Sequence, residues 1–465
     1  MEKKRIALLT PVHPQKTGIA DYIEEMLPYL RRSLGDDFEI DLFVDDCKPT
    51  SEDILLNHRF FPIEYFETMR QDYSLCVYQM GNNNLHIRIF ELALKYPGLL
   101  VMHDFAIHNM VAYYYLEKLK SDTAYFQAVE DNHGRAARDL AYRRAANGEL
   151  GLWETDAIDY PMNRTVTQCA KGVIVFSEYA RKRLLAYDDA VPIHRVYLHC
   201  SGKAQALSDE EISKARRQLK LHIKRGESLI CVFGFIGRAK RPYSILEAAR
   251  KLKQAGQQFK LIFVGKLQDD CKDLPATIRK MGLQGMVSIT GFTSGENFDR
   301  YVRAADVCIS LRYPTMGETS GVLMRALRYG KPSVVTNIGT FEEFPDDTVV
   351  KIGCGETEVD ELTEALKKLL GDVATREAMA KKAVQYAAAH LEPQSTADSF
   401  AGFVKELIAF EQLRTDPMYL EMRDKMLDTY NPIIKTDGYY LYTIAHRLCE
   451  LFPSAAETDT QEETE

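Results

Sequence analysis

Short apolar runs alternate with amphipathic helical segments through most of the chain, and the whole pattern occurs twice. In the first half the expected strands are 5–10, 41–44, 75–78, 99–103, 172–176 and 193–197. In the second half they are 229–234, 260–265, 287–291, 306–311, 333–336 and 348–352. Alternation of this kind predicts parallel sheets with helices on both faces, so the expected fold class is α/β with two doubly wound, Rossmann-like domains.

The chain has 465 residues, too many for one compact domain. The alternation pauses around residues 201–203, where we place a linker. The predicted domains are 1–202 and 203–413. A tyrosine-rich stretch, 414–452, is predicted to be a helical extension that packs back on the first domain. The acidic tail 453–465 has too little apolar content for a core and is predicted to be disordered.

Composition excludes several function classes. The net charge is −8, and five of the acidic side chains lie in the last eleven residues. The body of the chain therefore has no strong basic field, and nucleic acid is not an expected partner. The nine cysteines form no Cys-x-x-Cys pair, which indicates free thiols in a reducing compartment and no zinc site.

The N-terminus leads directly into the first expected strand, and no apolar run reaches the roughly 18 residues of a membrane span. We therefore expect a cytoplasmic protein without a leader or an anchor. Residues 109–153 are rich in tyrosine and arginine, and two alternatives stay open for them. They form either a solvated helical face or a peripheral contact with the inner face of a membrane.

Two glycine-containing loops follow strands of the second half and precede helices. The first is 234–242, with three cationic side chains, and the second is 314–321, with Glu318 in the turn. Glycines allow close approach of a ligand, and the free N–H groups at the start of a helix favour an anion such as a phosphate. Two such loops suit one ligand with a diphosphate and a hydroxyl-rich end, as in a nucleotide-sugar.

A third loop of this type ends the first expected strand, where Thr17 and Gly18 precede a helix predicted over 19–34. One glycine loop is a weak signal, because such loops open many α/β proteins. Its agreement with the two later loops adds weight to an anion-binding site.

These loops carry a family resemblance. The stretch 234–242, and 317–321 followed by 325–332, resemble the donor-site signatures of retaining glycosyltransferases of the GT-B fold, in the large group called family 4. The Gly-Glu-Thr-Ser-Gly form resembles a bacterial branch of that group. The resemblance extends from about Ile6 to about Leu407. It implies two Rossmann-like domains facing across a cleft, with C-terminal helices.

The resemblance also implies roles for individual residues. The implied catalytic residues are Lys240, Glu318 and His103, with Lys240 on the departing phosphate, Glu318 on sugar hydroxyls and His103 against the transferred sugar. The implied donor-binding residues are Gly18, Gly234, Arg238, Lys240, Phe292, Thr293, Glu318, Thr319, Ser320 and Gly321. No metal and no cofactor beyond the nucleotide-sugar substrate is implied.

The sequence departs from the family pattern at two places. Phe235 stands where the family usually has an arginine, and Arg238 is our candidate for the replacement cation. Arg325 stands where many relatives have a glutamate that binds ribose, which leaves Glu343 as a fallback for that role.

Two histidines near His103 are weaker candidates. His86 and His108 also follow expected strands, but a single histidine is more often a hydrogen-bonded structural residue. Position at a strand end, with Asp104 adjacent, favours His103 over both.

Taken together, the expected activity is transfer of a sugar, with retention, from a UDP- or GDP-linked donor to a glycan, lipid-linked or other hydroxyl acceptor. Two alternatives stay open. One is a different enzyme on the same scaffold, a nucleotide-sugar epimerase or a glycan phosphorylase, and the other is a non-catalytic subunit that binds sugar nucleotides. The residues do not indicate an oligomeric state.

Overall fold

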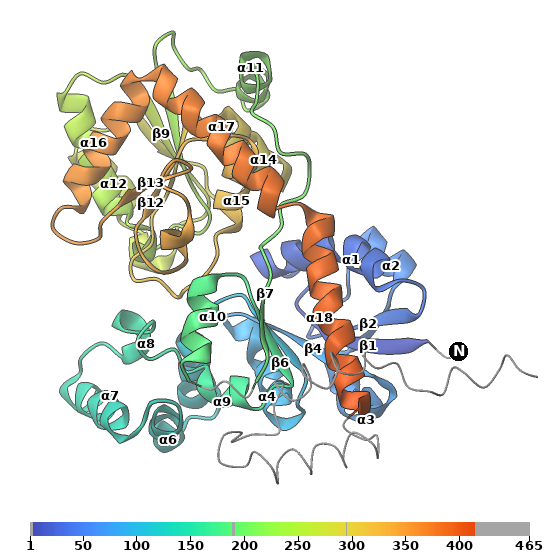
Figure 1. The fold of residues 1–465 in the computed structure, drawn as a ribbon. Coiled ribbons are helices and arrows are strands. Elements are labelled where there is room, and N and C mark those ends of the chain that lie inside the picture. The colour runs from blue at the N-terminus through green and yellow to red at the C-terminus, as the bar shows by residue number, and fades with distance from the viewer. Residues whose placement is uncertain (1–2, 188–190, 294, 414–465) are drawn as a thin grey trace, which may run out of the picture.

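The computed structural model describes residues 3–187, 191–293 and 295–413. They form two α/β domains joined near residue 200, with one sheet in each (Figure 1). The segments predicted as a C-terminal extension, 414–452, and as a disordered tail, 453–465, lie outside the described residues.

The first sheet has seven parallel strands in the order β3-β2-β1-β4-β5-β6-β7. They are β1 (Lys4–Leu9), β2 (Phe38–Val44), β3 (Arg59–Pro62), β4 (Leu75–Met80), β5 (Leu99–Met102), β6 (Gly172–Val175) and β7 (Ile193–Arg195). Six were expected at nearly these positions. The short edge strand β3 was not, because its residues do not form the apolar run of a buried strand.

The second sheet has six parallel strands in the order β10-β9-β8-β11-β12-β13. They are β8 (Ser228–Phe233), β9 (Phe259–Val264), β10 (Val287–Ile289), β11 (Val307–Ser310), β12 (Ser333–Thr336) and β13 (Val350–Ile352). All six were expected. The prediction of two parallel-sheet, Rossmann-like domains is confirmed.

Helices cover both faces of each sheet. Those of the first domain are α1 (Gly18–Leu34), α2 (Glu52–Asn57), α3 (Phe66–Met69), α4 (Ile87–Lys95), α5 (His108–Ala112), α6 (Asp122–His133), α7 (Arg135–Asn147), α8 (Leu152–Thr155), α9 (Arg164–Gln168) and α10 (Glu178–Leu185). Those that follow are α11 (Asp209–Gln218), α12 (Pro242–Gln254), α13 (Leu274–Lys280), α14 (Gly295–Ala304), α15 (Gly321–Arg328), α16 (Glu358–Gly371), α17 (Val373–His390) and α18 (Pro393–Leu413).

Alternate residues of a central strand pack on opposite faces of its sheet. In β1, Ala7 and Leu9 join one apolar core cluster, whereas Ile6 and Leu8 join the cluster on the other face. Because both faces are covered, the strand is apolar throughout, as is usual for a parallel sheet. The parallel register brings the carboxyl ends of β1, β4 and β5 to one edge, where ligands of such folds bind.

Helix α18 does not pack where the sequence placed it. The predicted second domain, 203–413, includes this helix, but Phe400, Phe403 and Leu407 are buried in the core of the first domain. Figure 1 shows α18 running away from α17 and along α1. The domain boundary is therefore wrong for this helix, because its apolar side chains pack with those of α1 in one core cluster of the first domain.

Candidate functional site

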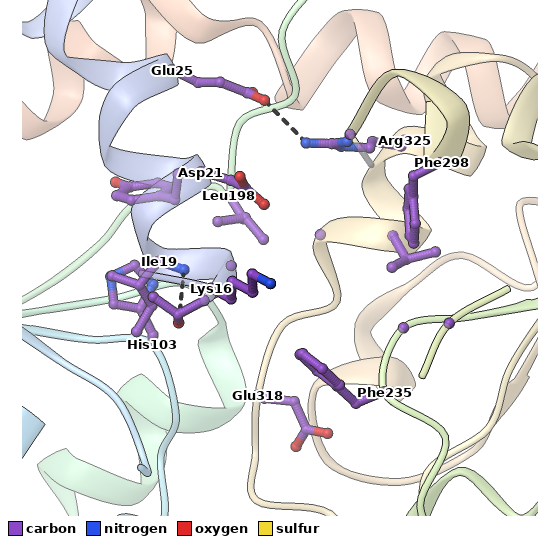
Figure 2. A pocket seen from close by; sticks show the side chains of 18 of the residues that line it. Lys16, Ile19, Asp21, Glu25, His103, Leu198, Phe235, Phe298, Glu318 and Arg325 are labelled. Carbon is purple, nitrogen blue, oxygen red and sulfur yellow. Dashed lines mark hydrogen bonds and ion pairs between the residues drawn. The ribbon is translucent and has the colours of Figure 1, made fainter. Parts of the chain in front are cut away.

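A cleft with a volume of about 650 Å³ lies between the two domains. Its first wall comes from the loop after β1, the start of α1 and the carboxyl ends of β4, β5 and β6. Its second wall comes from the loops that follow β8, β9, β10 and β11. Figure 2 shows Lys16 and Asp21 on one side, facing Phe235, Glu318 and Arg325 on the other.

Two helices from opposite domains begin at this cleft. Thr17 is the N-cap of α1 and accepts a hydrogen bond from the amide of Ile19 at 3.4 Å, and Ser320 caps α15 by accepting from the amide of Leu323 at 3.3 Å. Gly18 and Gly321 are the first helical residues and both line the cleft. A Cβ atom on Gly18 would meet nothing within 4 Å. A Cβ atom on Gly321 would meet only Leu198 Cδ2, at 4.0 Å. Both helix starts therefore leave room beside their amides, where an anion is favoured.

Gly317 lies at a contact between the two domains, unlike Gly18 and Gly321, which line the cleft. Its φ is +68°, and a Cβ atom there would lie 2.6 Å from the Cβ atom of Phe105 in the first domain. Beside it, the amide of Ala106 donates to the carbonyl of Met316 across the domain boundary at 2.8 Å. The glycine thus permits close packing of the two domains at the floor of the cleft.

Glu318 is held in one orientation by three donors. Its carboxylate pairs with Arg312 Nε at 2.8 Å and accepts from the Thr315 hydroxyl at 3.0 Å and the Met316 amide at 2.8 Å. It still lines the cleft, together with Thr319. The structure therefore presents Glu318 as a fixed hydrogen-bond acceptor, a state suited to binding hydroxyl groups.

Lys240 lies directly behind Gly234. Its ammonium donates to the carbonyl of Phe233, and a Cβ atom on Gly234 would lie 2.7 Å from Nζ. Burial lowers the pKa of Lys240 well below its usual value, the nearby Arg312 lowers it further and Glu318 opposes this shift. Gly234 lines the cleft, whereas Lys240 is not among the described residues that line it. The lysine therefore lies at the edge of the cleft, behind the glycine.

His103 lines the cleft at the end of β5. Its Nε2 contacts Gln79 Oε1 at 2.7 Å, and because that oxygen only accepts, Nε2 carries the proton. Its ring packs edge-on against Tyr22, with centroids 4.9 Å apart. Burial lowers its pKa to about 3, so the imidazole is neutral at pH 7.

The loop after β10 supplies two further predicted residues. Phe292 and Thr293 both line the cleft, and the ammonium of Lys16 lies 4.6 Å from the centre of the Phe292 ring. This cation–π contact joins the two domains at the opening of the cleft.

Two predicted residues have other contacts. Arg238 donates from Nε to the carbonyl of Asp270 at 3.0 Å and is absent from the described lining of the cleft. Glu343 accepts from the amides of Glu178 and Tyr179, at 3.0 and 2.5 Å, at the start of α10. In this structure neither residue is brought to the cleft, since each is already committed to a partner outside it.

His86 and His108 are structural histidines. His86 donates from Nδ1 to the carbonyl of Gln79 at 2.9 Å, and His108 Nε2 bonds the hydroxyl of Tyr125 at 2.8 Å. Both are fully buried and neither lines the cleft in the described residues. The preference for His103 over these two agrees with their placement.

Arg325, one of the two departures, forms an ion pair across the cleft. Its Nη2 lies 3.0 Å from Glu25 Oε1 on α1 (Figure 2). The side chain thus links the two walls at one end. Sequence reasoning did not find Glu25, because only the fold brings α1 opposite α15.

Among the polar residues of the cleft that were not predicted to act there are Lys16, Asp104 and Lys266. Their one signal in the sequence is position, since each follows directly on a strand or its first loop. Burial raises the pKa of Asp104 to about 7, and the nearby Glu318 carboxylate adds to the shift. This end of the cleft is therefore acidic, whereas Lys16 and Lys266 make another part of it cationic.

Among the helices of residues 3–187, 191–293 and 295–413, none has the length and hydropathy of a membrane span. No group of three or more His, Cys, Asp or Glu side chains in the same ranges could hold a metal ion.

Residues 213–386 match the sequence family described as "Glycosyl transferases group 1". Among curated proteins, the alpha-D-kanosaminyltransferase of Streptomyces kanamyceticus is 24% identical over 255 residues. That alignment covers 54% of this chain and 65% of the length of the relative.

Solved structures show the same fold. HepE of Anabaena in complex with UDP superposes with a TM-score of 0.59 at 15% identity, over 86% of this chain and 99% of that one. The sucrose-phosphate synthase of Thermosynechococcus elongatus gives 0.58 at 16% identity, over 88% of this chain and 100% of that one. The described chain therefore has the GT-B fold, and its second domain carries the sequence match to the group 1 glycosyl transferases.

Proposed function

We propose that this protein is a retaining glycosyltransferase that takes its sugar from a nucleoside-diphosphate sugar bound in the interdomain cleft. The observation that carries the proposal is the convergence of two helix starts, α1 and α15, on one cleft that also contains a fixed carboxylate, Glu318. Fixed N–H dipoles stabilise a departing phosphate, while the carboxylate holds sugar hydroxyls.

The cations of the cleft support a diphosphate at its centre. Lys16 and Lys266 line the cleft, and neither forms an ion pair with a carboxylate in the described residues that line it. Lys240 stands behind Gly234 with its pKa lowered by burial. An arriving diphosphate would raise the pKa of this amine again, because it places negative charge beside it.

The hydrogen bonds of Glu318 support a transfer that retains the configuration of the sugar's anomeric carbon without a covalent intermediate. A carboxylate already engaged by Arg312, Thr315 and Met316 is a poor nucleophile. In the proposed reaction the acceptor hydroxyl therefore attacks on the face that the phosphate leaves, and the phosphate oxygen takes its proton. No step of this scheme uses a metal ion.

UDP is our first candidate for the nucleotide. HepE, whose fold this chain shares, was solved with UDP, and another of its structures was solved with UDP-glucose. Phe292 and Thr293 would lie beside the base. GDP remains the comparison nucleotide. For the acceptor we propose a glycan, a lipid-linked sugar or another hydroxylated molecule of surface polysaccharide synthesis, reached by a cytoplasmic enzyme that contacts the membrane peripherally.

A panel of UDP- and GDP-sugars tests the proposal. We expect slow release of the nucleotide by the wild type, with Glu318→Ala and Lys240→Ala each reducing the rate by more than about a hundredfold. Asp360→Asn, an exposed change on α16, is the matched control and should keep the wild-type rate. A product with an inverted ring carbon would indicate the epimerase instead, and binding without turnover would indicate the non-catalytic subunit.

A further inference from the structure

Among the described carboxylates that line the cleft, Asp104 differs from the others because it has no cationic partner. Asp21 pairs with His13 Nε2 at 2.9 Å, Glu25 with Arg325 at 3.0 Å and Glu318 with Arg312 at 2.8 Å. Asp104 forms no ion pair with any described residue. Its Oδ2 accepts from the amide of Asn82 at 2.8 Å, and its other oxygen has no hydrogen bond to the described chain.

The surroundings of Asp104 are negative. The Glu318 carboxylate approaches it from the second domain, and Arg312, a described cation that is close to both, is already bound to Glu318. The adjacent imidazole of His103 is neutral and its proton is given to Gln79. Burial and the nearby Glu318 raise the pKa of Asp104 to about 7, so a positively charged ligand group beside it would replace a bound proton near neutral pH.

We propose that the sugar carried by the donor bears an amino group, and that Asp104 binds this ammonium opposite Glu318. The inference rests on the proposed function, because it assumes that the sugar occupies the end of the cleft lined by His103, Asp104 and Glu318. It makes Asp104 a residue that determines which sugar is accepted.

An ammonium fits this site better than a hydroxyl does. A hydroxyl can donate one hydrogen bond, but it brings no charge, so Asp104 must either keep its proton or face Glu318 as a second negative group. An ammonium donates three hydrogen bonds and neutralises one unit of that charge. Asp104 is held by Asn82 through one oxygen only, which leaves the other to face the ligand.

The experiment compares ligands that differ in one group. The probes are UDP, UDP-glucose, and UDP-glucose with an amine in place of one ring hydroxyl at a time, each measured by calorimetry. For the wild type we expect one of the amines to bind about tenfold or more tighter than UDP-glucose, the scale of a hydrogen bond between charged groups. Asp104→Asn should reduce this preference to less than about twofold while leaving the affinity for UDP unchanged.

Proton release gives a second measurement. Below neutral pH, binding of the amine should displace the proton of Asp104, so the measured enthalpy should depend on the ionisation enthalpy of the buffer. This dependence should be lost in Asp104→Asn and kept in the control Asp360→Asn.

The outcomes separate this inference from the proposed function. If UDP-glucose binds as tightly as every amine, or if Asp104→Asn weakens amine and hydroxyl sugars equally, the amino-sugar inference is wrong although the donor site stands. If neither the UDP series nor a matched GDP series binds, the proposed function itself fails.

Discussion

Among individual residues, Gly234 shows most clearly how one position shapes the cleft. Its φ is +92°, which side chains rarely adopt, and its missing side chain makes room for Lys240 Nζ. One glycine therefore serves both the turn and the lysine behind it. The sequence pattern predicted a glycine loop here, but not that the loop would cover the lysine.

Gly234→Ala should destabilise the protein by about 2–4 kcal/mol, because strained backbone adds to the loss of the hydrogen bond from Lys240 to the Phe233 carbonyl when the amine shifts away from the new Cβ atom. The measurement is urea unfolding. Gly226→Ala is the matched control, since Gly226 has a φ of +81° and nothing within 4 Å of the added Cβ atom. The free energy of unfolding of this control should fall only by the cost of the strained backbone. Equal losses of stability in the two variants would show that Lys240 does not add to the effect at Gly234.

Asp104 predicts a pH dependence of stability. Its pKa rises from an ordinary value of about 3.9 to about 7 in the folded protein, chiefly through burial. Between these values the folded state binds more protons than the unfolded state, so its contribution to stability is lost as pH rises. Asp104→Asn should therefore gain about 1–3 kcal/mol relative to wild type above pH 7, and the gain should vanish near pH 4. Thermal melting across this range would contradict the assignment if the difference stayed constant.

At the scale of elements, the two domains meet through groups that lie far apart in the sequence. The Glu343 carboxylate accepts from the first amides of α10, and Arg325 reaches Glu25 on α1. A carboxylate at a helix start is also favoured by the helix dipole. These contacts link the two domains beside the cleft.

Glu343→Ala removes one of these contacts and should loosen the domain arrangement. We expect a larger radius of gyration in solution scattering and weaker binding of the nucleotide-sugar, with a loss of about 0.5–1 kcal/mol in stability. Glu342→Ala, at the exposed neighbouring position, should change none of the three. A variant at Glu343 with unchanged scattering and affinity would show that the contact does not hold the domains.

The sequence predicted elements better than it predicted their contacts. All twelve expected strands are present. They could be predicted because a buried parallel strand is a short apolar run, which is a local signal in the sequence. The same signal failed for β3, an edge strand, and it could not assign α18 to a domain. Asp104 and Glu25 were missed as site residues because their roles depend on what the other domain places opposite them.

At the scale of the whole molecule, α18 links the end of the described chain to its beginning. It leaves the second domain after α17 and contributes Phe400 and Phe403 to the core of the first. The first domain is therefore complete only when the chain has passed through the second. This arrangement couples the folding of the two domains.

Phe400→Ala tests the placement of α18 in the first domain. Phe400 is 2% exposed, so the cavity should cost about 3–5 kcal/mol. Hydrogen exchange should speed up in α1 and β1 more than in β8 and β9, although Phe400 is far closer in sequence to the second domain. Faster exchange confined to the second domain would place α18 there, as the sequence first suggested.

The central claim is that the diphosphate of the donor binds between the N-termini of α1 and α15. A crystal structure with a UDP-sugar tests it most directly. We expect the diphosphate beside Gly18, Gly321 and the ammonium of Lys240, with the sugar against Glu318 and His103. A diphosphate bound away from this cleft, or contacting only one of the two domains, would contradict the account.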